Sequence, residues 1–210
     1  AEEYPEFMSK LTGTKVMIID HHKTDTKSEA LILKPENLNF EKSYQYPTVK
    51  LVYDLMSELV NLEDISWMVA VGLISDASAD TWHEFMQKIF EEFKFKNKTE
   101  WIDTIPGVIA QIINSATSVN PKRTEEMLEL LLTKSIPEIL KSSLADLNRD
   151  INMEIKHVIE NIKLEKYHDG ALNIIQIEPK YAIGGVVSNK LSFAERTKTF
   201  IVMSMYKDHV

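Results

Sequence analysis

The chain has 210 residues, of which 44% are hydrophobic and 27% are charged, and this globular composition excludes a disordered tail or a fibrous repeat. It contains no cysteine, which excludes disulfides, thiolate zinc sites and thiol nucleophiles. The net charge of −8 excludes a protein whose whole surface is basic and binds nucleic acid, but it is compatible with a local basic groove. No apolar run approaches the length of a membrane span, so we expect a cytoplasmic protein without membrane contacts.

The first strand is predicted at residues 15–20, because Val16 to Ile19 are apolar without polar alternation. Such a run is typical of a strand buried on both faces of a parallel sheet. A short helix over residues 1–11 precedes it, and a second strand is predicted at residues 30–33. A buried strand needs neighbours on both sides, so the pattern predicts a sheet that lacks its first strands, as in a fragment.

Three side chains that bind metals elsewhere follow this strand directly: Asp20, His21 and His22. Open α/β sheets place their binding sites at the carboxyl ends of the strands. The sequence therefore predicts a metal or phosphate site at this end of the sheet. The alternative is a surface turn with two solvated histidines.

Three helices are predicted next, over residues 47–59, 64–76 and 80–93. The nearly continuous apolar run at 64–76 fits a buried strand and a buried helix about equally by periodicity. Its length and the Asp64 cap favour a helix. The aromatic face of the third helix is expected to be core, with a base-stacking surface as the alternative.

Residues 99–142 are predicted to be a helical connector that is broken at Pro106-Gly107, and an amphipathic helix is predicted between residues 140 and 162. A strand at 172–177, a helix at 186–193 and a strand at 200–205 indicate the start of a second small α/β subdomain.

Residues 180–210 carry more basic than acidic side chains. The basic residues are Lys180, Lys190, Arg196, Lys198 and Lys207, set against Glu195 and Asp208. This excess makes the segment a candidate nucleic-acid face, and solvated surface charge is the alternative.

Two segments together resemble motifs of the DHH phosphoesterase superfamily. The strand that runs into Asp20-His21-His22 is similar to the third motif of that family. Gly72-Leu73-Ile74-Ser75-Asp76 is similar to its fourth motif, an aspartate that ends a buried apolar helix. Pro47-Thr48-Val49 opens a helix as the middle helix of the family does, and residues 184–206 look like the first helix and strand of the accessory DHHA1 subdomain. The closest likeness is to archaeal RecJ-like exonucleases.

The resemblance covers residues 1–93 firmly and 170–210 loosely, and it implies a two-metal phosphoesterase that uses Mn²⁺ or Mg²⁺. His21 and Asp76 would ligate one ion, and His22 would contact the scissile phosphate as a catalytic residue. Asp20 would orient the histidines, and so assist catalysis, or would lie close to the metal.

The resemblance also implies a domain order: a partial DHH domain over residues 1–95, a helical connector over 96–166, and a partial DHHA1-like subdomain over 167–210. The fold class expected is α/β, with the C-terminal part of a doubly wound, mainly parallel sheet.

The chain departs from the family pattern in two places. The histidine and aspartates of the first motif, and the bridging aspartate of the second, are absent from residues 1–14, whose carboxylates are Glu2, Glu3 and Glu6. The terminal Gly-Gly-Gly-His motif is absent too, because no histidine follows Gly184-Gly185. We therefore expect half of a metal site and a chain that is inactive by itself.

The function expected from the resemblance is metal-dependent hydrolysis of phosphodiesters in single-stranded nucleic acid. One alternative is a phosphatase or phosphodiesterase for small substrates such as short oligonucleotides, cyclic dinucleotides or nucleoside phosphates. Another is a catalytically silent relative that serves as a scaffold in a replication complex. An exposed sheet edge would also favour pairing with a second copy of the chain, giving a homo-oligomer.

Overall fold

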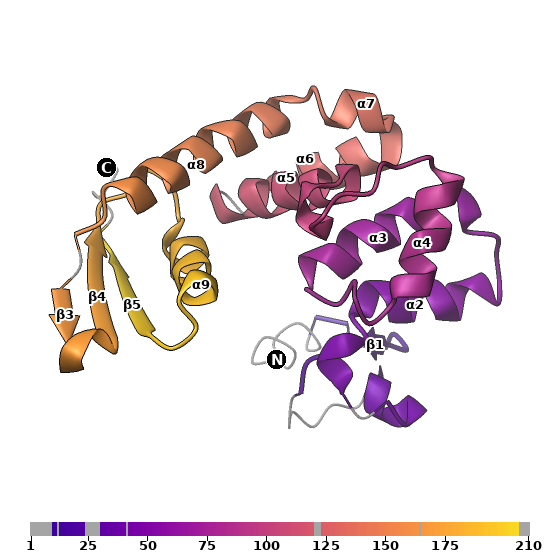
Figure 1. Ribbon diagram of the computed structural model, residues 1–210. Coiled ribbons are helices and arrows are strands. Elements are labelled where there is room, and N and C mark those ends of the chain that lie inside the picture. Colours follow the sequence, from indigo (N-terminus) through magenta and orange to yellow (C-terminus); the bar gives the residue numbers. More distant parts are fainter. Residues whose placement is uncertain are drawn as a thin grey trace. The chain divides into compact units, whose positions relative to one another are not determined.

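A computed structural model describes residues 10–11, 13–23, 30–40, 42–119, 123–163 and 165–205 (Figure 1). The helix predicted for residues 1–11 lies outside the described residues except for its last two positions. The fold is mixed α/β and mostly helical, with short strands in two separate sheets. Among the helices of the described residues, none is long and apolar enough to cross a membrane.

The chain divides into two compact units, residues 1–110 and residues 111–210. This division falls inside the predicted helical connector. The predicted order of a domain over 1–95, a connector over 96–166 and a subdomain over 167–210 stays a prediction.

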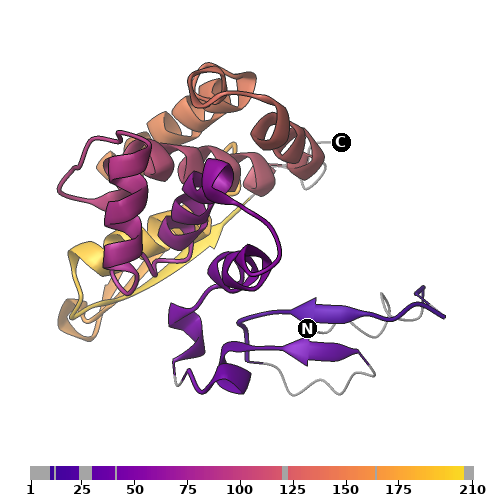
Figure 2. The ribbon, with the colours of Figure 1, turned by 90° about the vertical axis from the view of Figure 1, so that its right-hand side faces the viewer.

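The sheet of the first unit consists, within the described residues, of two parallel strands, β1 (Met17–Ile19) and β2 (Leu31–Leu33) (Figure 2). Met17 pairs with Leu31, and these two residues are 45% and 66% exposed. The expectation of a strand buried on both faces is therefore not met. The apolar run forms a strand, but in the described residues it has one neighbouring strand, so one of its edges and part of its faces stay open.

Helices cover the rest of the first unit. They are the 3₁₀ segments Pro35–Leu38, Ser43–Gln45, Glu63–Ile65 and Trp101–Asp103, and the helices α2 (Thr48–Ser57), α3 (Ser66–Ser75) and α4 (His83–Glu92). The ambiguous apolar run thus forms a helix, α3, whose Ala70 and Leu73 are fully buried. Met86, Ile89 and Phe90 of α4 are buried as well, so its apolar face belongs to the core, as the sequence predicts.

Helix α5 (Ile105–Val119) begins at the point where the sequence predicts a break. Proline is tolerated in the first turn of a helix, because the N–H that it lacks has no partner inside the helix there. A Cβ at Gly107 would lie 2.4 Å from the Trp101 carbonyl oxygen, so this turn packs against the preceding 3₁₀ segment. Pro106-Gly107 therefore marks the start of a helix and not a break within one, which corrects the expectation.

Among its described residues, the second unit holds the end of α5, four further α-helices, the 3₁₀ segment His168–Gly170 and one three-stranded sheet. Its elements are α6 (Arg123–Thr133), α7 (Ile136–Ile139), α8 (Ser143–Glu160), β3 (Glu165–Tyr167), β4 (Leu172–Ile177), α9 (Gly184–Ala194) and β5 (Thr199–Ser204). Ser142 accepts a hydrogen bond from the Ala145 N–H and so caps α8, which is why α8 begins after the predicted start of the amphipathic helix.

The sheet of the second unit has the order β3-β4-β5, with β3 antiparallel and β5 parallel to β4 (Figure 1). Helices α8 and α9 bury their apolar sides against one face of this sheet. The core there is formed by Ile151, Ile155, Ile175, Ile177, Ile183, Val187 and Phe200. The β4-α9-β5 unit matches the predicted strand, helix and strand to within two residues at each end.

Candidate metal centre

Asp20, His21 and His22 come together directly after β1. One ligand atom from each of them lies within 4.8 Å of the other two. The Asp20 N–H donates to the Leu33 carbonyl oxygen at 3.1 Å, which extends the β1–β2 pairing by one residue and fixes where the cluster begins. Asp20 is 8% exposed, so its carboxylate belongs to the buried end of the strand.

The Asp20 carboxylate orients His22. Its Oδ1 accepts the backbone N–H of His22 at 3.0 Å and faces the ring Nδ1 of His22 at 2.8 Å. An ionised carboxylate accepts only, so the contact assigns the ring proton to Nδ1. The His22 side chain is 72% exposed, so most of its ring surface is open to solvent.

His21 is held by the first residue of α2. Its Nδ1 lies 3.2 Å from the backbone N of Thr48 and 3.0 Å from Thr48 Oγ1. The first N–H groups of a helix have no partner inside the helix, and Pro47 provides no side-chain cap. The imidazole takes that role and ties the end of β1 to the start of α2. The rings of His21 and His22 lie 4.2 Å apart between centroids.

Asp76 is the residue that caps the carboxyl end of α3, and it is exposed. It is not a member of the cluster of three ligand atoms. Its N–H donates to the Gly72 carbonyl oxygen, and a Cβ at Gly72 would lie 2.5 Å from Val49 Cγ1. The end of α3 therefore lies against the start of α2, next to Thr48. That Asp76 shares an ion with His21 stays a prediction.

Lys34 adds positive charge to the cluster. It follows β2, and its Nζ donates to the backbone oxygen of His22 at 2.8 Å. No motif in the sequence marks this lysine as part of the site. The signal was its position, since the carboxyl ends of two parallel strands meet at one edge of a sheet.

A buried lysine stabilises the first turns of α2. Lys50 is 5% exposed, lies 4.2 Å from the ring centroid of Trp82, and binds both oxygens of Asp54. Tyr46 donates its hydroxyl proton to Asp54 at 2.5 Å. Burial first, and then this hydrogen bond, raise the pKa of Tyr46 well above its usual range. The group fixes the helix that carries Thr48, and nothing in the sequence marks the lysine as buried.

Among the described residues, no other histidine belongs to this cluster of ligand atoms. His83 is exposed and contacts Gln87 on its own helix, as the sequence analysis expects of a solvated side chain. His168, Asp169 and Gly170 form a turn with three consecutive positive φ angles, so the prediction of a turn there is confirmed.

Comparison with known proteins adds no relative: no protein-family model matches the chain, and no curated protein does.

Proposed function

We propose that the chain carries part of the active site of a metal-dependent phosphoesterase of the DHH type, close to the RecJ-like exonucleases. Its substrate would be the phosphodiester backbone of single-stranded nucleic acid. The first unit would then be a partial DHH domain, part of a doubly wound sheet, and the β4-α9-β5 unit the start of a DHHA1-like subdomain. The observation that supports this function is the convergence of Asp20, His21 and His22 at the carboxyl end of β1.

Of the three clustered side chains, His21 would be the direct metal ligand, with the Asp20 carboxylate close by. Imidazole and carboxylate donors suit Mn²⁺. Mg²⁺ and Mn²⁺ prefer about six ligands, so Asp76, further residues and water would supply the rest. Two such ions, when bound, polarise the phosphoryl oxygen and activate a water molecule for in-line attack.

Each side chain has a separate task in this proposal. His21 and Asp76 would hold one ion. The Nδ1–H of His21 would then donate a hydrogen bond to Thr48 Oγ1. Asp20 would hold His22 by its Nδ1–H. With a second proton on Nε2, the resulting imidazolium would bind the phosphate or give that proton to the leaving oxygen. Lys34 lies on the same edge and offsets the negative charge of the substrate.

The cluster also bears on the alternatives. A scaffold without catalysis has no use for a carboxylate that orients a surface histidine, so the Asp20–His22 contact disfavours it. The exposed His22 could contact the phosphate of a nucleic-acid chain or of a small phosphoester. An assay that compares substrates of different length distinguishes these two functions.

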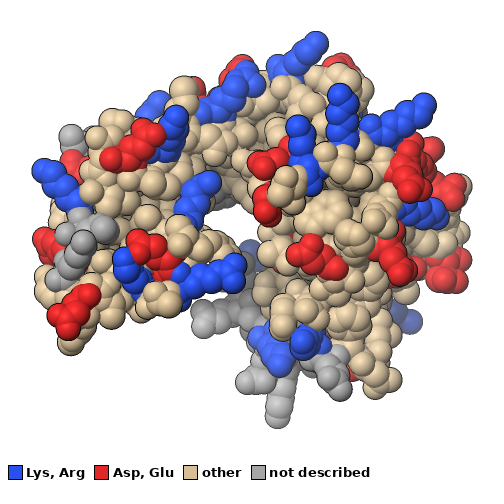
Figure 3. All heavy atoms as spheres, in the orientation of Figure 1, with Lys and Arg blue, Asp and Glu red and all other residues tan. Residues whose placement is uncertain are grey.

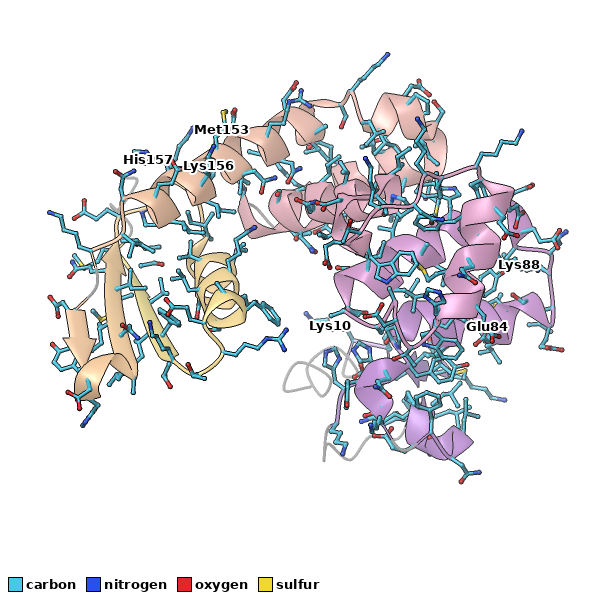
Figure 4. All side chains as sticks on the ribbon, in the orientation of Figure 1. Lys10, Glu84, Lys88, Met153, Lys156 and His157 are labelled. Carbon is cyan, nitrogen blue, oxygen red and sulfur yellow. The ribbon has the colours of Figure 1, made fainter. Side chains whose placement is uncertain are left out.

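The test compares two histidine variants of the full-length gene product. His21→Ala is expected to lower Mn²⁺-dependent cleavage of a single-stranded oligonucleotide at least about a hundredfold, because one ligand is lost. His157→Ala is the matched control, since His157 lies on the outer side of α8, in the other unit (Figure 4). Parental cleavage by His21→Ala would contradict the assignment.

A second measurement concerns the 210-residue chain alone. We expect no cleavage and no saturable Mn²⁺ binding by calorimetry in the micromolar range, because the chain supplies too few ligands. Paramagnetic Mn²⁺ should still broaden the ring signals of His21 and His22 before those of His157. Metal-dependent turnover by this chain would show that the remaining ligands lie within it.

A further inference from the structure

One flank of α9 carries an apolar and basic stripe. The inner side of the helix is seated on the sheet through Val187, which is fully buried. Val186, Lys190 and Phe193 follow one another at intervals of four and three, so they share one flank of the helix, beside the side that faces the sheet. Lys190 is exposed, and Val186 and Phe193 are 42% and 72% exposed.

Phe193 is one of the two most exposed large apolar side chains in the described part of the chain. The other is Leu59, also 72% exposed, in the first unit. Single exposed apolar residues are normal and carry no meaning alone. Phe193 differs from Leu59 in what surrounds it: Leu59 follows Glu58, whereas Phe193 has Lys190 one turn before it and Arg196 three residues after it.

The cations beside Phe193 are available for a ligand. Glu195 forms an ion pair with Lys198. Within the described residues, neither Lys190 nor Arg196 takes part in an ion pair. Figure 3 shows basic side chains around the end of α9 that leads into β5, with acidic atoms between them. In a chain of net charge −8, this is a local excess of positive charge.

A hollow adjoins the turn that follows α9. It has a volume of about 410 Å³ and is lined by Asp169, Gly170, Asn173 and Lys198. Arg196 and Lys198, which lines this hollow, belong to the same turn between α9 and β5.

We propose that Phe193, Lys190 and Arg196 form a binding site for single-stranded nucleic acid, and this rests on the proposed function. A base stacks on the Phe193 ring, and the adjoining phosphates meet the two cations. On a helix, Cβ atoms three residues apart lie about 5–6 Å from each other, so one nucleotide reaches both Lys190 and Phe193. Paired bases in a duplex present no free face to the ring, so the site selects single strands.

The first experiment measures fluorescence anisotropy of a labelled oligothymidylate of about 12 nucleotides with the 210-residue chain, in EDTA and low salt. Phe193→Ala is expected to weaken binding about five- to tenfold, and Phe193→Trp to keep or strengthen it. Leu59→Ala is the matched control because it removes an equally exposed apolar side chain, and it should bind like the parent. Circular dichroism checks that each variant is folded.

The second experiment separates the ring from the charges. With an abasic oligomer of the same length, Phe193→Ala should bind like the parent, because no base remains to stack. Lys190→Gln and Arg196→Gln should each lower the slope of log affinity against log salt by about 0.7. Lys156→Gln is the charge control, since Lys156 lies on the outer side of α8 (Figure 4).

The site is overturned if the chain does not bind oligothymidylate, if Phe193→Ala binds it like the parent, or if a duplex binds more tightly. Equal loss of abasic and thymidylate binding by Phe193→Ala would also contradict stacking. Because these assays contain EDTA, they do not depend on hydrolysis. If Phe193→Ala weakens binding but His21→Ala leaves hydrolysis unchanged, the proposed function is contradicted and this binding site is not. If His21→Ala abolishes hydrolysis but Phe193→Ala leaves binding unchanged, this binding site is contradicted and the proposed function is not.

Discussion

The two hydrogen-bonding groups of Thr48 require opposite states of the His21 ring. The backbone N–H of Thr48 always donates, so it needs a lone pair on Nδ1. The hydroxyl oxygen of Thr48 can instead accept a hydrogen bond from a protonated Nδ1. A metal ion on Nε2 requires the second arrangement, because a ligating histidine carries its proton on the other nitrogen. The Thr48 hydroxyl is therefore the group that makes the metal-binding form of His21 accessible.

The role of the Thr48 hydroxyl predicts different effects for two substitutions at position 48. Thr48→Val removes the acceptor and should weaken Mn²⁺ affinity of the full-length gene product about ten- to a hundredfold. Thr48→Ser keeps the hydroxyl and should bind Mn²⁺ within about twofold of the parent. The measurement is the Mn²⁺ concentration that gives half-maximal cleavage. Equal values for both variants would mean that Nε2 of His21 does not bind the ion.

For single residues, the sequence predicts the candidate metal-binding side chains but not the residues that hydrogen-bond to them. Asp20, His21 and His22 stand out because three such side chains follow one strand. Thr48 and Lys34 are ordinary residue types, and their contacts with the histidines depend on the pairing of β1 with β2 and on the position of α2. Lys50 was missed because lysine is almost never buried, and its burial here depends on Asp54 and Trp82.

The pairing of α2 with α3 places the end of one helix beside the start of the other. Gly72 allows this approach, since a methyl group there would meet Val49 Cγ1 at 2.5 Å. The glycine costs helix stability relative to alanine by about 1 kcal/mol. The close contact that it permits brings the carboxyl end of α3 next to Thr48.

Gly72→Ala is therefore expected to destabilise the chain, although alanine is the better helix former. Overpacking of this kind costs about 1–3 kcal/mol, measured as the free energy of unfolding in urea. Gly185→Ala is the control, because a Cβ at Gly185, also in a helix, has no atom within 4 Å. That variant should be unchanged or stabilised by about 0.5 kcal/mol. Adding Val49→Ala to Gly72→Ala should recover part of the lost free energy of unfolding. If the two substitutions instead have additive effects, the strain caused by Gly72→Ala does not come from contact with Val49.

Hydrophobic periodicity predicted whether a segment is a helix or a strand where the periodic segment was long. It predicted the residues at which helices and strands end less accurately. Helix α3 and the β4-α9-β5 unit were predictable because their buried positions carry apolar residues over several consecutive turns or strand residues. The short strand β3 was missed, since three residues, Glu165 to Tyr167, carry no periodic signal and depend on pairing with β4. The Pro106-Gly107 pair was misread because these residues end one helix as readily as they begin another.

Each of the two units has a buried core of its own. Leu73 and Met86 are fully buried in the first unit, and Ile175 and Val187 in the second. The helix α5 contains the division, with Ala110 on one side of it and Gln111 on the other. Units with separate cores unfold as separate cooperative steps unless the connection between them couples their stabilities.

We therefore expect urea unfolding of the chain to occur in two steps, with each step sensitive to substitutions in one unit only. Leu73→Ala should lower the free energy of the first-unit step by about 2–5 kcal/mol, and Ile175→Ala should do the same to the second-unit step. Tryptophan fluorescence follows the first unit alone, since Trp67, Trp82 and Trp101 all lie in it, while circular dichroism follows both units. Coincident transitions by the two signals, shifted together by either substitution, would show instead that α5 couples the units into one cooperative structure.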